Sequence, residues 1–227
     1  MSGEALRKVR EERGWTQMEA AARLGLSQAY VALLEKGRRR IPVKLARKAV
    51  RVLNLSPVLL PLAEKLTASP GGDLARDLSR LGYPGFAYLR GGWSKNPGEV
   101  LLTALRQSTL DSRVAEALPW VLLHYSEVDA DWLVSQARLL NLTNRLGFVV
   151  DLARRVLEAR SETDSARYRS LTRLSEALRS SRLAVEDTFG RELTETERNW
   201  LRANRPPEAE FWNLLTNWQP EFLQHTL

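Results

Sequence analysis

The sequence predicts an all-α protein with a small basic N-terminal domain and a larger, nearly neutral helical domain. Three observations lead to this prediction. Apolar residues recur at the helical spacing of roughly 3.6, and no segment alternates with period two for long enough to predict a sheet. Glycine and proline interrupt this pattern between residues 67 and 98. The excess of positive charge lies entirely before that interruption.

The composition is typical of a globular protein. The 227 residues are 44% hydrophobic and 27% charged, which gives room for one large domain or two modest ones. No apolar run approaches the roughly 18–20 residues of a membrane-spanning helix, and the N-terminus is charged rather than signal-like. We therefore expect a cytoplasmic protein. Because cysteine is absent, disulfides, a thiolate nucleophile and a cysteine-ligated metal are excluded.

Charge is divided unevenly along the chain. Residues 1–65 hold 14 Lys and Arg against 6 Asp and Glu, whereas residues 66–227 hold 20 against 21. A basic module joined to a nearly neutral body indicates a polyanionic partner for the module alone. The alternative is a basic solvated surface without such a partner, and charge by itself does not decide between the two.

The first two predicted helices both end at glycines. One covers residues 4–13 and stops before Gly14. The other starts after Thr16, which can form a capping box with Glu19, and it stops at Gly25.

Three further helices complete the basic region. Ser27 caps the third helix, which ends at Gly37, and the fourth helix follows Pro42. The fifth helix starts at Pro57, because proline suits a first helical turn, and its leucines extend to Leu66.

The corner between the second and third helices has a distinctive pattern. The small side chain of Ala21 lets the two helices approach closely, and Gly25 permits the positive φ of a tight turn. Val31 and Leu34 then pin the third helix to the second. The opposite face of the third helix is left outward, as a DNA recognition helix requires. The alternative is an αα-hairpin that serves packing only.

The stretch LRKVREERGWTQMEAAARLGLSQAYVALLEKGRRR resembles the Cro/cI-like helix-turn-helix of the XRE type. The resemblance includes the Arg-x-x-Arg-Gly end of the first helix and the Glu-x-Gly after the third, and it covers residues 4–66. It implies a DNA-binding domain. It also implies that Arg10 and Glu35 form an internal salt bridge and that Gln17 meets a phosphate.

The face of the third helix carries the residues expected to read bases. Gln28 can pair bidentately with adenine, and alanine can touch a thymine methyl group. Leu33 departs from the family, where a polar residue is common, and it either contacts thymine or belongs to a protein interface. The residues expected to face the major groove are Ser27, Gln28, Ala29, Ala32 and Leu33.

The cations after the third helix are expected to contact the DNA backbone. They begin where the recognition helix ends, so phosphates would pass beside them, although an exposed basic run is more often only a solvated surface. Tyr30 either donates to a phosphate or packs. The residues expected to meet phosphates are Thr16, Gln17, Tyr30, Lys36, Arg38, Arg39 and Arg40.

The segment 67–98 separates the two predicted domains. TASPGG reads as a linker, and DLARDLSRLG reads as one short helix. YPGFAYLRGGWSKNPG is too aromatic for a spacer, so we expect it to pack on one domain.

Residues 99–227 predict an α-helical domain that dimerises, senses a signal or binds a partner. Leucines in its fifth helix, together with Val185, form a stripe that is either ordinary core or a dimer interface. Its tryptophans are core, a pocket or an interface. The predicted helices cover residues 99–107, 111–124, 129–141, 143–160, 163–188, 195–204 and 207–218.

No catalytic motif is evident. His124 and His225 stand alone, HExxH is absent, and the carboxylates of EVDAD are better explained by helix capping than by a metal loop. RLLNLTNRLGFVVDLARR superficially resembles a second helix-turn-helix, but Gly147 falls where an apolar pin is needed. We expect no enzymatic activity, no cofactor and no metal.

The sequence as a whole predicts a sequence-specific transcriptional regulator. We expect a repressor that binds double-stranded DNA as a homodimer, with a small effector or protein partner at the C-terminal domain. One alternative is an antitoxin-like protein that neutralises a toxin-like partner and autoregulates its operon. Another is a scaffold or nucleoid-type DNA binder, since base-reading polar residues are few.

Overall fold

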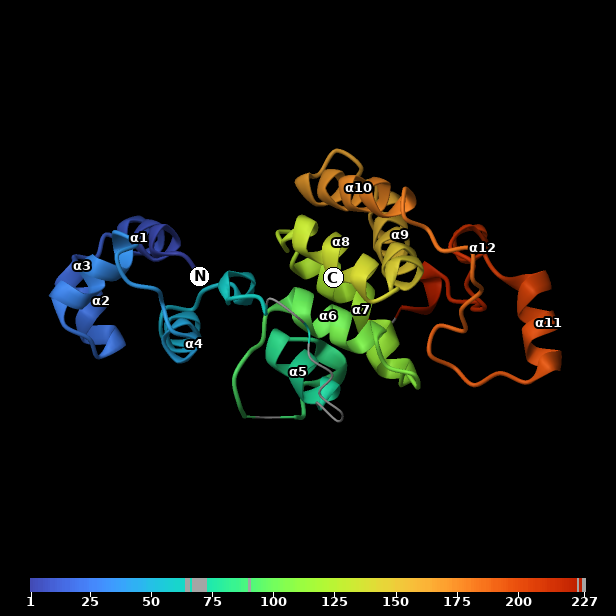
Figure 1. The fold of residues 1–227 in the computed structure, drawn as a ribbon, viewed down its shortest axis with the longest axis horizontal. Helices are drawn as coiled ribbons and strands as arrows, with labels where there is room; N and C mark the ends of the chain where they lie inside the picture. Colours follow the sequence, from blue (N-terminus) through green and yellow to red (C-terminus); the bar gives the residue numbers. More distant parts are fainter. Residues whose placement is uncertain (64–65, 67–72, 90, 224, 226–227) are drawn as a thin grey trace. The chain divides into compact units, whose positions relative to one another are not determined.

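The computed structural model describes residues 1–63, 66, 73–89, 91–223 and 225 (Figure 1). In these residues the regular structure is helical, apart from one isolated β-bridge between Asp187 and Leu214. The prediction of an all-α protein is confirmed. The linker predicted at 67–72 lies outside the described residues.

The chain divides into two compact units. The N-terminal unit is Met1–Ala63 with Trp93–Asn96, and the C-terminal unit is Glu64–Gly92 with Pro97–Leu227. The sequence predicts a DNA-binding domain at residues 1–66, a linker at 67–98 and a dimerisation, sensor or partner-binding domain at 99–227. These roles stay predictions.

The N-terminal unit is built from four α-helices and one 3₁₀ turn within its described residues. Its small core joins one leucine from each of α1, α2 and α3 to the C-terminal end of α4, and the central members are Leu6, Leu24, Leu34, Ala49 and Leu53. The elements are α1 Gly3–Glu12, α2 Gln17–Leu24, α3 Gln28–Glu35, α4 Val43–Val52 and η1 Pro57–Leu59.

The corner between α2 and α3 is closed by backbone hydrogen bonds. Gly25 has φ 65°, and its N–H donates to the carbonyl of Ala22, while the Leu26 N–H donates to that of Ala21 at 2.9 Å. This is a Schellman ending, in which a left-handed residue satisfies the last carbonyls of a helix. Glycine adopts this conformation without strain, so the turn angle is set by the sequence itself.

The fifth helix of the basic region is shorter than its leucine pattern predicts. The structure has only the 3₁₀ turn η1, and Leu60 is extended rather than helical. Leu60 precedes Pro61, and a residue before proline is disfavoured in the α conformation.

The aromatic segment expected on one domain is divided between the two units. Tyr83 and Phe86 are buried in the C-terminal unit. Further along, Trp93 lies under the Arg51 guanidinium at 4.4 Å, within the N-terminal unit. The Asn96 side-chain amide donates to the Val58 carbonyl and to the Leu60 carbonyl, both at 2.9 Å. A segment distant in sequence thus completes the small N-terminal unit.

The C-terminal unit is organised around α9, which packs against α6, α7, α8, α10 and α12 (Figure 1). Because α9 is enclosed, it is not presented as a second recognition helix. The elements of the C-terminal unit are α5 Leu74–Leu81, η2 Pro84–Phe86, α6 Pro97–Leu105, α7 Ser112–His124, α8 Ala130–Leu139, α9 Thr143–Ala159, α10 Ala166–Arg179, α11 Glu195–Asn204, α12 Pro207–Phe211 and η3 Pro220–Phe222.

A buried carboxylate ties three parts of this unit together. Asp151 on α9 accepts hydrogen bonds from the Trp212 indole N–H at 2.7 Å and from the Ser175 hydroxyl at 2.8 Å. The Arg154 guanidinium donates to the same carboxylate at 3.0 Å. Gly147 lies one turn before Asp151 on α9, and a Cβ there would overlap the indole ring. Glycine therefore lets the tryptophan reach the carboxylate.

Two predicted helices end early. The helix expected over 163–188 stops at Arg179, because the Ser180 and Ser181 hydroxyls donate to carbonyls of the last turn. The leucines of its stripe are core, while Val185 is exposed and lies outside the helix. The helix expected over 207–218 stops at Phe211.

Replacing Asp151 with alanine should destabilise the C-terminal unit alone. Trp212 and Ser175 would lose their acceptor and Arg154 its buried counter-charge, a loss of about 3–5 kcal/mol in the free energy of unfolding. Hydrogen exchange across a guanidinium titration, followed on α9 and α3 peptides, measures the two units separately. Asp164→Ala, at an exposed position, is the matched control, and equal losses in both variants would contradict the assignment.

Candidate nucleic-acid interface

Helix α3 is anchored on one side and open on the other. Val31 and Leu34 are fully buried against the core of the N-terminal unit. Gln28 and Ala29 are exposed at the start of the helix, and Ala32 is half-buried. An amide side chain therefore stands on the open face of a helix whose opposite face is fixed.

Ser27, a predicted base-reading residue, and Tyr30, a predicted phosphate contact, also have local structural roles. The Ser27 hydroxyl accepts the Tyr30 N–H at 3.2 Å and so caps α3, which leaves the hydroxyl proton to donate. Tyr30 itself is half-buried and packs on the core. Leu33 is half-buried as well.

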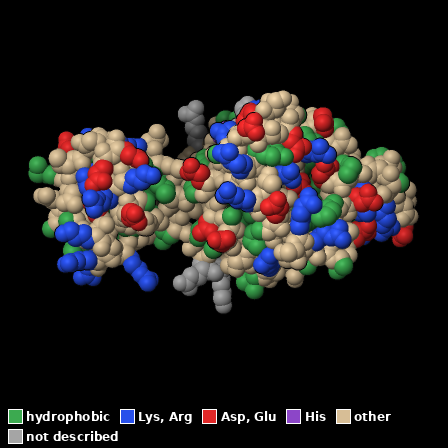
Figure 2. Space-filling view, turned by 90° about the horizontal axis from the view of Figure 1, so that it is seen from above, with side chains coloured by type: hydrophobic (Ala, Val, Ile, Leu, Met, Phe, Trp, Pro, Cys, Tyr) green, Lys and Arg blue, Asp and Glu red, His purple; other side chains and the backbone are tan. Residues whose placement is uncertain are grey.

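The cations that follow α3 are exposed. Within the described residues, none of Lys36, Arg38, Arg39 and Arg40 has a carboxylate within ion-pair distance. Figure 2 shows Lys and Arg side chains gathered along one edge of the N-terminal unit. Their charge is thus uncompensated inside the protein and available to an external anion.

A hydrogen-bonded ion pair joins α1, α2 and α3. Arg10 donates to Glu35 from Nε at 2.6 Å and from Nη2 at 3.0 Å, so the contact is bidentate. Gln17 Nε2 donates to the same carboxylate at 2.9 Å. Burial acts to raise the pKa of Glu35, but the hydrogen bonds from Arg10 and Gln17 outweigh it and hold this pKa below its ordinary value.

The start of α2 differs from the simple phosphate site expected there. The Thr16 hydroxyl accepts the Glu19 N–H and donates to the Glu19 carboxylate, so both its functions are used in the capping box. The side-chain amide of Gln17 is committed to Glu35 through one of its protons. The backbone amides of Gln17 and Met18 stay unpaired within the described structure, and they are the donors left for an anion.

Residues 6–60 match the family described as Helix-turn-helix. The N-terminal region is a helix-turn-helix domain of the XRE type. The match implies a DNA-binding transcription regulator, and such regulators are typically non-enzymatic. Comparison with curated proteins and with solved structures found no match to this chain. The C-terminal unit lies outside the matched residues.

The helix-turn-helix domain contains two features that sequence reasoning missed. The contact between Gln17 and Glu35 joins residues on different helices, so no helical spacing points to it. Lys44 is exposed in the first turn of α4, where a cation opposes the helix dipole, and it has no carboxylate partner among the described residues. The signal that could have found Lys44 is its closeness in the sequence to the arginine run at 38–40.

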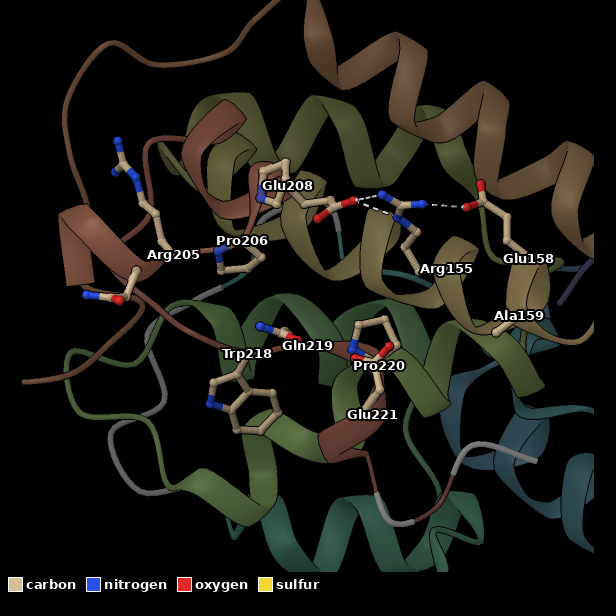
Figure 3. A pocket seen from close by; sticks show the side chains of 12 residues that line it. Arg155, Glu158, Ala159, Arg205, Pro206, Glu208, Trp218, Gln219, Pro220 and Glu221 are labelled. Atoms are coloured by element: carbon tan, nitrogen blue, oxygen red, sulfur yellow. Dashed lines mark hydrogen bonds and ion pairs between the residues drawn. The ribbon is translucent and has the colours of Figure 1, made fainter. Parts of the chain in front are cut away.

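A cavity of about 510 Å³ lies in the C-terminal unit beside α9 (Figure 3). Trp218 and Pro220 line one side, and Arg155 lies on the other. The Arg155 guanidinium contacts Glu208 at 2.6 Å and Glu158 at 3.3 Å, so its charge is already compensated. Of the tryptophans named above as core, pocket or interface, Trp218 is one that lines this cavity.

The other tryptophans of the C-terminal unit that are named here lie either in the core or on the surface. Trp212 and Trp120 are core, whereas Trp200 is 55% exposed. His124 stacks on Trp120 at 4.0 Å, and His225 meets the edge of Tyr83, so both histidines have packing contacts. No cluster of three potential metal ligands occurs in the part of the chain that the structure describes. Among the same residues, no helix is long and apolar enough to span a membrane.

The Arg10–Glu35–Gln17 network makes the helix-turn-helix domain sensitive to acid. Since the folded-state pKa of Glu35 is depressed below 4.5, its contribution is fully present above that pH and is lost as pH falls through the folded-state pKa. Glu35→Gln should lower the stability of the domain at pH 7 by about 1–3 kcal/mol and flatten its acid dependence.

Urea unfolding at several pH values measures this effect, with hydrogen exchange of α3 amides as the probe of the helix-turn-helix domain. Glu12→Gln, at an exposed position in α1, is the control and should leave the profile nearly unchanged. If the free energy of unfolding falls equally steeply with decreasing pH in Glu35→Gln and in the natural protein, the network does not have this role.

Proposed function

We propose that this chain is a sequence-specific transcriptional repressor that binds the major groove as a homodimer. The observation that carries the proposal is the open face of α3, with Gln28 exposed at its start and unpaired cations beyond its end. Gln28 supplies direct readout, and Ala29, Ala32 and Leu33 supply apolar contact to thymine methyl groups. A DNA target is in keeping with a protein of the cytoplasm.

The phosphate contacts set the register of α3 in the groove. Lys36 and the three arginines that follow Gly37 grip the backbone on one side, and the free amides at the start of α2 meet it on the other. The C-terminal unit pairs two such domains, because one small helix-turn-helix makes too few contacts for firm occupancy.

Footprinting on the DNA upstream of the gene, combined with transcription in vitro from that DNA, tests this function. Protection that overlaps the promoter and lowered transcription support a repressor. Protection without lowered transcription, or uniform coating of the DNA, would overturn it. Uniform coating is the expectation for a nucleoid-type binder.

Trp200 favours a second candidate function. It is 55% exposed on α11 and lines a cavity of about 410 Å³ with Leu201 and Asn217. Exposed tryptophans are frequent anchors of protein interfaces. This agrees with an antitoxin-like protein that holds a partner there and uses DNA binding for autoregulation. Footprints that strengthen or shift when a co-encoded protein is added would favour this candidate.

Gln28→Ala should weaken binding to the preferred site selectively. A bidentate amide contact to adenine is worth about 1–3 kcal/mol of discrimination, whereas the phosphate contacts are untouched. Titrations against the preferred duplex and a scrambled duplex at one salt concentration measure the difference. Gln107→Ala, in the C-terminal unit, is the matched control. Equal losses on both duplexes would show that Gln28 does not read bases.

Replacing Arg38, Arg39 and Arg40 with alanine should reduce affinity on every sequence. Each lost phosphate contact should make the slope of log K against log salt shallower by roughly 0.9. Binding isotherms between low and moderate salt give the slope. Arg113, Arg167 and Arg169 of the C-terminal unit, changed together, control for net charge. An unaltered slope in the first variant would mean that the run is only a solvated surface.

A further inference from the structure

A surface groove of about 890 Å³ runs between α8 and α10, which are neighbours in the C-terminal unit (Figure 1). Leu174 and Ala177 of α10 form part of one wall. The leucine stripe of α10 is buried in the core and offers no interface of its own. The residues that α8 contributes to the groove are Ala130, Asp131, Val134, Ser135, Arg138 and Leu139.

The α8 residues of the groove form a self-complementary pattern. They are placed symmetrically about a point between Val134 and Ser135. A two-fold axis at that point would set each member against its mirror position on a second, antiparallel α8. Asp131 would then face Arg138 of the second copy, and the same contact would occur again with the roles exchanged. An isologous interface has this property, that residue i meets j and j meets i.

Within the described residues, neither Asp131 nor Arg138 has an opposite charge within ion-pair distance, although Arg173 of α10 also lines the groove. Asp131 is exposed, and no hydrogen bond or ion pair is found for it among the described residues. Arg138 is held in place by the Ser181 hydroxyl at 3.0 Å and the Ala177 carbonyl at 3.0 Å, but no carboxylate of the described residues lies within ion-pair distance. One anion and one fixed cation thus stand two helical turns apart on the same face.

The apolar members fit the same arrangement. Leu139 is 64% exposed, and its mirror position is the small Ala130. Val134 and Ser135 would lie at the crossing point. Val134 is only 8% exposed and Ser135 is short, so neither side chain prevents the separation of about 8–10 Å between axes that packed helices have.

We propose that α8 pairs with α8 of a second copy of this chain, antiparallel and about a two-fold axis between Val134 and Ser135. The proposal rests on the dimeric function proposed above and names the face that forms the dimer. The Asp131–Arg138 contacts fix the register, and Leu139 is covered at each end of the pair. The two-fold axis presents two DNA-binding domains to two half-sites.

A different reason for the charges is the helix dipole. Asp131 lies in the first turn of α8 and Arg138 in its last turn, where these signs are favourable within one chain. That effect is intramolecular, so a second chain cannot restore it. Mixing of charge variants therefore separates the two explanations.

The experiment uses two full-length variants, Asp131→Arg and Arg138→Glu. Each alone places like charges at both contacts, which should raise the dimer dissociation constant at least about tenfold. An equimolar mixture should form a heterodimer with nearly the natural affinity, because the introduced arginine of one chain then meets the introduced glutamate of the other and the second contact is natural. Asp164→Arg, outside the groove, is the matched control for charge. Sedimentation and native mass spectrometry count the species.

Arg138→Glu also removes the bonds to Ser181 and the Ala177 carbonyl, so a second measurement guards against misfolding. The chain has no cysteine. Ser135→Cys should therefore be joined into a covalent dimer by a short bis-maleimide, whereas Asp164→Cys should not.

The outcomes separate this proposal from the proposed function. Recovery of the dimer on mixing, with cross-linking at residue 135, supports pairing through α8. A natural dimer that survives Asp131→Arg unchanged and gives no cross-link at 135 overturns the α8 face but leaves a dimeric repressor standing. A natural protein that stays monomeric on DNA overturns both. Loss of dimer in each variant without recovery on mixing overturns the two-fold pairing.

Discussion

The bidentate contact between Arg10 and Glu35 is the interaction on which the DNA-binding domain depends. Its carboxylate receives Arg10 from α1 and Gln17 from α2, while Glu35 itself closes α3. Two helices are thereby held at the end of the recognition helix, just before the arginine run. The domain is small, and its central core consists of four leucines and one alanine. A buried charge pair is a weak source of net stability, but losing either partner strands the other, so the pair fixes one arrangement of the three helices.

The C-terminal unit uses the same device on a larger scale. Asp151 is buried at the centre of α9 and gathers Trp212, Ser175 and Arg154. Around it lies the large buried cluster of the C-terminal unit, which leaves other side chains on the outer faces. The groove beside α8 and the exposed tryptophan of α11 lie on such faces, and the network leaves both untouched.

Much of the DNA-binding domain was predictable, because its signals are local. Caps at Thr16 and Ser27 and the glycine at 25 act within one turn of the chain, and the sequence shows them directly. The early end of α10 and the extended Leu60 depend on hydroxyl and proline effects that an apolar period does not register. The commitment of Gln17 to Glu35 and the return of Trp93 to the N-terminal unit are long-range contacts, and only the fold reveals them. The proposed pairing face of α8 could not be predicted from the sequence for a different reason. The sequence does not show which leucines are buried, and the structure shows that Leu139 is exposed whereas the leucines of α10 are buried.

In the proposed dimer, two helix-turn-helix domains paired by the C-terminal unit read two half-sites of one DNA duplex. Selection of bound duplexes from a random library by the full-length protein tests it most directly. Two paired domains should enrich an inverted repeat whose half-sites lie about 10–10.5 base pairs apart, or a multiple of that spacing. Enrichment of a single half-site, of a direct repeat or of no motif at all would contradict it.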